Sequence, residues 1–275
     1  MNRIFKWIFS SILILYFGVV LYIYFNQTSI IFSPSPNYHP PPKSFNISQK
    51  FIPFGNNDSL HTWYIKNNKR NLTVLYFTGN AFNISHRLFH VDVFNQLEIN
   101  AIMFDYKGFG LSTGFIDGKN SFYESSDLVY KYMIEALDIP ADSIIFWGYS
   151  LGAPISAELG NIKNPLGFIF ESPLININKI SAENYPYLPF PFINKYNFSL
   201  NDYNDKIQSP VLLIHSLKDE VIPFSHAYSF YESLNIKNKH LIKTEGTHRL
   251  SSFDSFPLYF NGIYKFINNI TEKVN

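Results

Sequence analysis

The sequence predicts an α/β fold with a mostly parallel central sheet and helices on both faces. Short apolar runs alternate with amphipathic stretches from Phe45 onward, which is typical of parallel strands joined by helices. A Gly-x-Ser-x-Gly pentapeptide lies between an apolar run and a helix-like stretch. A serine, a carboxylate and a histidine follow three expected strands in that order. Together these observations indicate a candidate site at the carboxyl edge of the sheet.

The expected elements follow from residue patterns. An antiparallel pair should lead the domain, because two apolar runs flank the turn-forming residues Asn56-Asn57-Asp58. Apolar runs predict further strands, and apolar residues at helical spacing predict helices. The expected strands are 51–54, 60–65, 72–77, 101–106, 143–149, 166–171, 211–216 and 240–244, and the expected helices are 85–97, 120–137, 153–159 and 255–270.

Composition excludes several classes of function. The chain has 275 residues, 46% of them hydrophobic, which suffices for one large packed domain and an extension. It has no cysteine, so disulfides, thiolate catalysis and cysteine-ligated metals are excluded. The net charge of +1 carries no basic surplus, so a nucleic acid partner is not expected. No motif calls for a cofactor or a metal.

The N-terminal segment predicts a membrane anchor over residues 1–32. Residues 7–25 carry no charge, and at about 1.5 Å per residue they span roughly the hydrocarbon thickness of a bilayer. Arg3 and Lys6 precede this run, so we expect a single-pass protein with a cytoplasmic N-terminus and an extracytoplasmic domain. The alternative is a cleaved signal peptide, but no small-x-small cleavage site follows the run.

A proline-rich linker should separate this anchor from the domain. Residues 33–44 contain five prolines, so we expect an extended tether that holds the domain, residues 45–275, a short distance from the membrane. A second irregular stretch, about 174–208, should form a short cap insertion. Its prolines exclude regular helix over residues 185–192, and its aromatic residues form either a wall for an acyl chain or ordinary packing.

The candidate nucleophile is Ser150. It follows the expected strand 143–149, and its neighbours Gly148 and Gly152 leave room for a sharp strand-to-helix turn. Such a turn presents the hydroxyl at the edge of the sheet, in front of the positive end of the next helix. The N–H of Leu151 then becomes one candidate oxyanion donor.

A serine needs a base, and the base needs a carboxylate that orients it. Asp219 follows the strand 211–216 and is the candidate acid, with the adjacent Glu220 as the alternative. His248 follows the strand 240–244 and is the candidate base. A second oxyanion donor should come from the loop after the strand 72–77, from Asn80 or alternatively from Ala81.

Five motifs stand out along the chain: Gly79-Asn80-Ala81, Asp105-Tyr106-Lys107-Gly108-Phe109-Gly110-Leu111-Ser112-Thr113-Gly114, Gly148-Tyr149-Ser150-Leu151-Gly152, Glu171-Ser172-Pro173 and the run from Pro210 to His215. Together they resemble the motifs of the α/β-hydrolase serine hydrolases, in particular the membrane-anchored branch of the α/β-hydrolase domain-containing proteins. The resemblance covers the chain from about Ile47 to the C-terminus. Thr78 stands where that family usually has His, and Ser216 stands where Gly is usual.

The resemblance implies an α/β-hydrolase fold and a serine hydrolase of the esterase, thioesterase or lipase type. The expected reaction cleaves a carboxylic ester or thioester of a small-molecule or lipid acyl substrate, through an acyl-enzyme on Ser150. Two alternatives remain open. One is a non-catalytic binding protein that retains the fold, and the other is a serine peptidase of the same fold.

Overall fold

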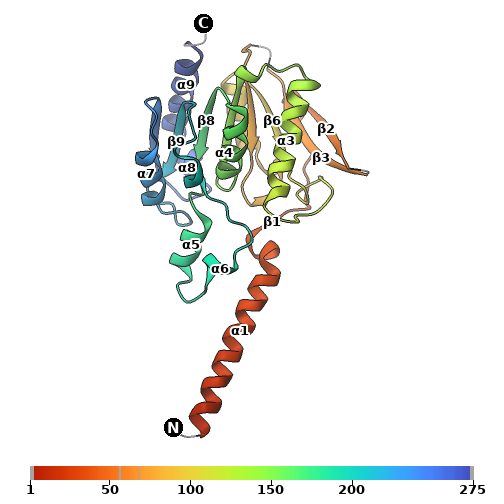
Figure 1. Ribbon diagram of the computed structural model, residues 1–275. Coiled ribbons are helices and arrows are strands. Elements are labelled where there is room, and N and C mark those ends of the chain that lie inside the picture. Colours follow the sequence, from red (N-terminus) through yellow and green to blue (C-terminus); the bar gives the residue numbers. More distant parts are fainter. Residues whose placement is uncertain (1–2, 56, 68, 273–275) are drawn as a thin grey trace.

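A computed structural model describes residues 3–55, 57–67 and 69–272. It consists of an α/β domain and one long N-terminal helix that projects from it (Figure 1). The domain is built on an eight-stranded sheet, with a separate two-stranded sheet beside it. Asn56, in the expected turn between the first two strands of the large sheet, lies outside the described residues.

The large sheet has the strand order β10-β9-β8-β7-β4-β6-β3-β2. Strands β2 and β3 are antiparallel to each other, β3 is antiparallel to β6, and every other neighbouring pair is parallel. The fold class is therefore as expected. The strands are β1 (Ser33–Pro34), β2 (Ile47–Phe54), β3 (Asp58–Ile65), β4 (Thr73–Phe77), β5 (Ala81–Phe82), β6 (Asn100–Phe104), β7 (Ile144–Tyr149), β8 (Gly167–Glu171), β9 (Val211–Ser216) and β10 (Lys239–Thr244).

Helices cover both faces of the sheet. Side chains of α3, α4 and α7 pack in the core on one face, and those of α2 and α9 pack in the core on the other. The α-helices are α1 (Arg3–Ile31), α2 (Leu88–Gln96), α3 (Asn120–Glu135), α4 (Gly152–Lys163), α5 (Ile177–Asn184), α6 (Phe190–Ile193), α7 (Phe224–Ser233), α8 (Ser251–Asp254) and α9 (Phe256–Thr271). Single 3₁₀ turns are η1 (Ile84–His86), η2 (Ala141–Ser143) and η3 (Leu200–Tyr203).

The alternation of side chains along β4 explains the two cores. Leu75 and Phe77 belong to the core under α3 and α4, whereas Val74 and Tyr76 belong to the core under α2 and α9. All residues of this strand are buried, as expected for a parallel strand with helices on both sides.

The strand order positions the site. The chain runs from β4 outward to β6 and then returns to place β7 on the other side of β4. The loops after β4 and β7 therefore leave the sheet side by side and diverge, which is the usual position of a ligand site in open α/β sheets. The first loop contains Asn80 and the second contains Ser150.

The proline-rich linker, which was expected to be an extended tether, lies against the domain. Ser33 and Pro34 form β1, which pairs in parallel with Ala81 and Phe82 of β5. Further along, the side chain of Asn83 donates hydrogen bonds to the carbonyl oxygens of Ser35 and Asn37, at 2.9 and 2.8 Å. The segment is extended, as its prolines require, but it is bound along the surface of the domain.

The cap also differs from expectation. The prolines of residues 185–192 permit one helical turn, α6, because Pro189 is its N-cap and Pro191 lies in its first turn, where no N–H is needed. The cap aromatics do not form a wall over a cavity, since Tyr185, Tyr187 and Phe192 are 57%, 86% and 91% exposed.

Helix α1 is long and apolar enough to cross a membrane. It is kinked at Asn26, whose backbone is not helical. Beyond the kink, Gln27 is buried against the cap: its side chain donates to the carbonyl of Ile193 and accepts from the N–H of Lys195. The C-terminal turn of α1 is thus part of the domain surface, and the N-terminal part of the helix projects away from the domain (Figure 1).

Candidate active site

Ser150 occupies a sharp turn between β7 and α4. Its φ of +51° is in the left-handed region, which residues with a side chain rarely adopt. A Cβ on Gly148 would lie 2.5 Å from Ala153 Cα, and one on Gly152 would overlap the carbonyl of Phe77. Both glycines are therefore required by packing, and the turn presents Ser150 at the N-terminus of α4.

The structure brings Ser150, His248 and Asp219 together. Nε2 of His248 lies 3.1 Å from Ser150 Oγ, and Nδ1 of the same ring lies 2.7 Å from Asp219 Oδ2. All three residues are buried, and Ser150 and His248 line a cavity. The adjacent Glu220 does not contact the imidazole; its carboxylate accepts a hydrogen bond from the backbone N–H of His248 at 2.9 Å.

The loop of Asp219 stabilises a carboxylate. Burial alone would raise the pKa of Asp219, but the hydrogen bond from His248, the charge of that ring and the N–H of Ile222 together hold the pKa below its ordinary value. The N–H groups of Val221 and Ile222 donate to Asp219 Oδ1 at 2.9 and 2.8 Å. One oxygen is thus held by the backbone, and the other faces His248.

Ser216, which replaces the glycine usual in the family that the sequence resembles, joins the loop that contains Asp219 to the loop that contains His248. Its hydroxyl donates to the carbonyl of Gly246 at 2.5 Å and accepts from the N–H of Lys218 at 3.0 Å. The hydroxyl therefore connects the loop that follows β9 to the loop that follows β10.

The two candidate oxyanion donors lie beside the serine. Within the described residues, the backbone N–H groups of Asn80 and Leu151 donate to no protein oxygen, and both residues line the cavity with Ser150. The N-terminal segment holds Asn80 from two directions. Its side chain donates to the carbonyl of Ile31 at 2.8 Å, and its own carbonyl accepts from the N–H of Ser33 at 2.9 Å.

Thr78, the other departure from the family pattern, is buried at the start of this loop. Its carbonyl accepts a hydrogen bond from the hydroxyl of Tyr106 at 3.3 Å. In the absence of the usual histidine, the loop is supported by Tyr106 beneath it and by the N-terminal segment at its outer side.

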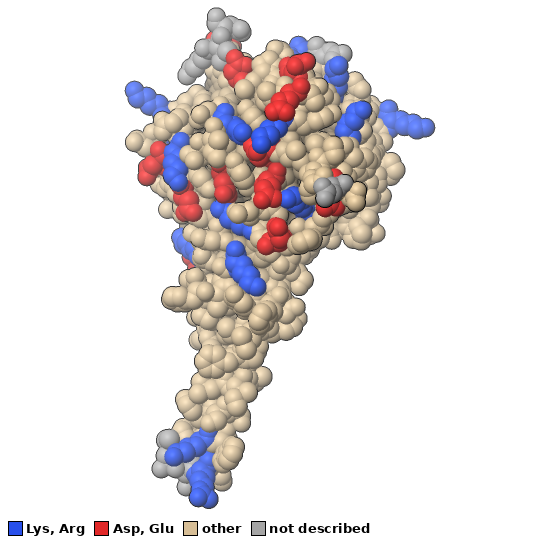
Figure 2. All heavy atoms as spheres, turned by 45° about the vertical axis from the view of Figure 1, so that its right-hand side comes forward, with Lys and Arg blue, Asp and Glu red and all other residues tan. Residues whose placement is uncertain are grey.

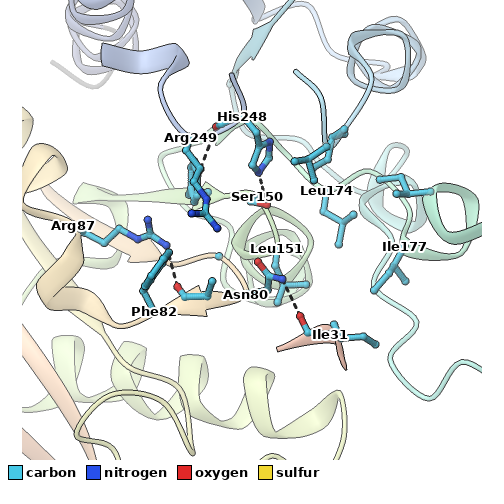
Figure 3. A pocket seen from close by; sticks show the side chains of 16 residues that line it. Ile31, Asn80, Phe82, Arg87, Ser150, Leu151, Leu174, Ile177, His248 and Arg249 are labelled. Carbon is cyan, nitrogen blue, oxygen red and sulfur yellow. Dashed lines mark hydrogen bonds between the residues drawn. The ribbon is translucent and has the colours of Figure 1, made fainter. Parts of the chain in front are cut away.

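A cavity of about 280 Å³ opens at Ser150. One wall is aliphatic and comes from the cap, the loop of Asp219 and the end of α1. It consists of Ile31, Leu174, Ile177, Ile180, Val221 and Ile222. The opposite side carries Arg87 and Arg249 (Figure 3). Within the described residues, no group of three or more His, Asp or Glu side chains is arranged to hold a metal ion.

Sequence reasoning did not identify these two arginines or Ile31. Arg249 directly follows His248, so its position near the site could have been inferred. Arg87 lies at the start of the helix after the oxyanion loop, where its distance from Ser150 depends on the fold. Ile31 reaches the cavity only because the N-terminal segment binds to the domain.

Comparisons with known proteins bear on the fold and on the relatives of the chain. No family model matches the chain. It is 29% identical to α/β-hydrolase domain-containing protein 17C of Mus musculus over 165 residues, which is 58% of this chain and 49% of that protein. It is 27% identical to α/β-hydrolase domain-containing protein WAV2 of Arabidopsis thaliana over 246 residues, 80% of this chain and 79% of the other. The chain thus spans about half the length of the first relatives and most of the second.

Among solved structures, an esterase of Pyrococcus furiosus superposes on 88% of this chain and 98% of its own, with a TM-score of 0.73 and 20% sequence identity. At that identity the likeness concerns the fold. Together, the sheet order, the turn at Ser150 and these relatives show that the chain has the α/β-hydrolase fold and is related to the α/β-hydrolase domain-containing proteins.

Proposed function

We propose that this chain is a membrane-tethered serine hydrolase that cleaves carboxylic esters or thioesters of acyl substrates through an acyl-enzyme. The observation that carries the proposal is the chain of contacts from Ser150 through His248 to Asp219. Nε2 of His248 lies 3.1 Å from Ser150 Oγ, and its Nδ1 lies 2.7 Å from Asp219 Oδ2. Ser150 and His248 line a cavity that has one aliphatic wall. An esterase among the structural neighbours is consistent with this class of reaction.

The geometry supports a two-step reaction. Ser150 Oγ bonds to the acyl carbonyl carbon while its proton passes to Nε2 of His248, and Asp219 stabilises the resulting imidazolium. The N–H groups of Leu151 and Asn80 stabilise the oxyanion. The carbon–oxygen or carbon–sulfur bond then breaks, and His248 protonates the leaving group. Water attacks the acyl-enzyme, gives its proton to His248, and the carboxylic acid leaves as Ser150 recovers its proton.

The test is covalent labelling of the full chain in detergent by a fluorophosphonate, which reacts with activated serines. We expect labelling of the wild type and none of Ser150→Ala, together with turnover of an acyl ester panel by the wild type alone. A folded wild type that neither reacts nor turns over esters would favour the non-catalytic binding protein. Cleavage of amide but not ester substrates would favour the peptidase.

The cap and α1 support a substrate held in a membrane. Tyr16, within the apolar run of α1, donates from its hydroxyl to the carbonyl of Tyr187 at the tip of the cap, at 2.9 Å. Lys195 of the cap lies 4.1 Å from the ring centre of Tyr24. Exposed aromatics and lysines are favoured at the membrane interface, so the cap tip is suited to contact the bilayer that α1 crosses.

The charges on α1 support an orientation. Figure 2 shows a long uncharged part of α1 between the domain and a basic N-terminal end, where Arg3 and Lys6 lie. This pattern favours a cytoplasmic N-terminus and an extracytoplasmic domain. Because the chain has no cysteine, Lys50→Cys on β2 gives a single thiol. A membrane-impermeant maleimide that reaches only the cytoplasmic face of the membrane should leave it unlabelled until the membrane itself is opened by detergent; labelling from the cytoplasmic face would reverse the orientation.

A further inference from the structure

The side of the cavity opposite its aliphatic wall carries two positive charges. Arg87 and Arg249 lie on one side of Ser150, and Leu174 and Ile177 lie on the other (Figure 3). The chemistry proposed for Ser150 uses neither arginine. The residues that line the cavity include no Asp or Glu.

The contacts of the two guanidinium groups leave their charges unpaired. Arg87 lies 5.1 Å from the ring centre of Tyr149 and donates one hydrogen bond, to the carbonyl of Ala81 at 3.1 Å, while its buried Nε has no partner. Arg249 lies 5.1 Å from the ring centre of Phe82. Among the described residues, neither arginine forms an ion pair.

The nearby carboxylates are engaged elsewhere. Glu171 accepts hydrogen bonds from His90, Trp147 and Tyr259 inside the core, and Asp219 faces His248. Burial raises the pKa of Tyr149 to about 12, and the charges of Arg87 and Arg249 oppose that rise, which agrees with both cations lying close to this ring.

A second cavity adjoins the first at the arginines. It measures about 180 Å³, and Arg87, Arg249 and Tyr149 line both cavities. Its other polar lining includes His86 and Ser252 and no acidic residue. The guanidinium groups thus stand between a space next to Ser150 and a neighbouring space that is suited to an anion.

The two walls orient a substrate. The acyl chain of an ester is apolar and gains most from the aliphatic wall formed by the cap. The leaving portion, on the other side of the scissile carbonyl, then lies against the arginines. Two guanidinium groups offer paired N–H donors that match phosphate oxygens, and unpaired cations bordering a cavity favour an anionic ligand.

We propose that Arg87 and Arg249 form a subsite for a phosphate group on the leaving portion of the substrate, so that the enzyme prefers single-chain acyl esters or thioesters whose alcohol or thiol carries phosphate. This inference rests on the proposed hydrolase function. The size of the first cavity, at the lower end of ligand pockets, favours one acyl chain. The phosphate can belong to a glycerol phosphate lipid or to coenzyme A.

The experiment measures kcat/KM of the purified full chain in neutral detergent for two matched pairs. One pair is lauroyl glycerol phosphate and lauroyl glycerol, and the other is lauroyl-coenzyme A and lauroyl-N-acetylcysteamine. The readout is the ratio of phosphate-bearing to neutral substrate, because a general loss of folded enzyme cancels in that ratio. We expect a ratio of at least about tenfold in one arm or both, and that arm identifies the source of the phosphate.

Arg249→Gln and the double variant with Arg87→Gln should bring that ratio close to one, and rising salt should lower it in the wild type. The matched control is Arg70→Gln, which removes a guanidinium that lies 5.3 Å from the ring centre of Tyr264, remote from Ser150, and should keep the ratio. A wild-type ratio near one in both arms, or a ratio that survives the double variant, overturns the subsite. Labelling of Ser150 by the fluorophosphonate separates that result from failure of the hydrolase proposal, in which neither labelling nor any turnover occurs.

Discussion

Two histidine–aspartate pairs in this protein have the same short contact in different surroundings. Nδ1 of His248 lies 2.7 Å from Asp219 Oδ2, and Nδ1 of His61 lies 2.7 Å from Asp105 Oδ2. The first pair ends at Ser150 and a cavity, through Nε2 of His248. In the second pair, Nε2 of His61 is buried and has no partner among the described residues.

The difference shows that the role of a histidine–aspartate pair depends on the groups around it and not on the contact between the two side chains. Asp105 accepts the N–H of Ile84 with its second oxygen, and Ser112 bonds to the backbone of both His61 and Asp105. These bonds connect β3 and β6 to the loop after β4. The second pair therefore organises the fold, whereas the first has the candidate nucleophile Ser150 and a cavity at its free end.

The largest expected effect distinguishes Ser150, which contacts the first pair, from Ser112, which contacts the second. Ser150→Ala should lower kcat for ester hydrolysis by roughly 10⁶-fold, and Asp219→Asn by roughly 10⁴-fold, because nucleophile and base act as a unit. Ser112→Ala is the matched control. It should retain fluorophosphonate labelling and lose about 1 kcal/mol of stability for its hydrogen bonds. Equal losses of turnover in the Ser150 and Ser112 variants would contradict the distinction.

A third pair, His90 and Glu171, extends the comparison to the dependence of stability on pH. Burial alone would raise the pKa of Glu171, but His90 and the donors Trp147 and Tyr259 hold it below its ordinary value of 4.5. Ionised Glu171 thus stabilises the fold above that pH, and this contribution is lost as the pH falls through the lower folded value. Glu171→Gln should cost about 3–5 kcal/mol at neutral pH and flatten the acid side of the stability profile. Urea unfolding between pH 3 and 7 measures it; an unchanged acid slope would contradict the assignment.

Removal of the structural histidine should affect stability more than chemistry. His61→Phe leaves Asp105 Oδ2 buried without its donor, so we expect the free energy of unfolding to fall by about 1–3 kcal/mol. Chemical denaturation gives this value, and kcat corrected for the labelled fraction should change only a few-fold. A loss of turnover comparable with that of Asp219→Asn would show that the second pair has a direct role in the reaction.

The smallest expected effect concerns the loop of Asn80, which the reaction proposed for Ser150, His248 and Asp219 requires as an oxyanion donor. Asn80→Ala removes the hydrogen bond to the carbonyl of Ile31 and keeps the backbone N–H. We expect a loss of about tenfold in kcat, because a loosened loop misplaces the oxyanion donor. Asn83→Ala, which cuts the bonds to Ser35 and Asn37 further along the linker, is the comparison variant. Measured kcat values check this: the loss should be larger for Asn80→Ala than for Asn83→Ala, and the reverse order would contradict the role of the Asn80 contact.

Local signals in the sequence predicted much of the fold. Buried strands appear as apolar runs, so β4, β7, β8 and β9 were expected within one or two residues of their bounds. Helix α7 (Phe224–Ser233) was not predicted, because only Ala227 and Phe230 and the neighbouring His226 are buried in it and the apolar spacing is weak. The β1–β5 pairing could not be predicted either, because it joins residues 33–34 to 81–82, and no local pattern encodes that contact.

In the candidate site, too, local sequence signals were sufficient for some features, and contacts between distant segments decided the others. Motif order predicted that Ser150, Asp219 and His248 would meet, since each follows a strand of one parallel sheet. The choice between Asp219 and Glu220 depended on loop geometry, in which one carboxylate faces the ring and the other faces a backbone N–H. The cationic side of the cavity was missed, because the position of Arg87 relative to Tyr149 is set by packing between separate elements.

The attachment of Asn80 to Ile31 and Ser33 has a consequence for what a protease would release if it cut the proposed membrane anchor from the domain. A protease that cleaved before Ile31 would release a domain that retains both partners of the oxyanion loop. One that cleaved within residues 34–44 would release a domain without them. The two cuts yield fragments of nearly equal size, yet the first fragment would keep the proposed activity, whereas the second would lose a large part of it in the same step.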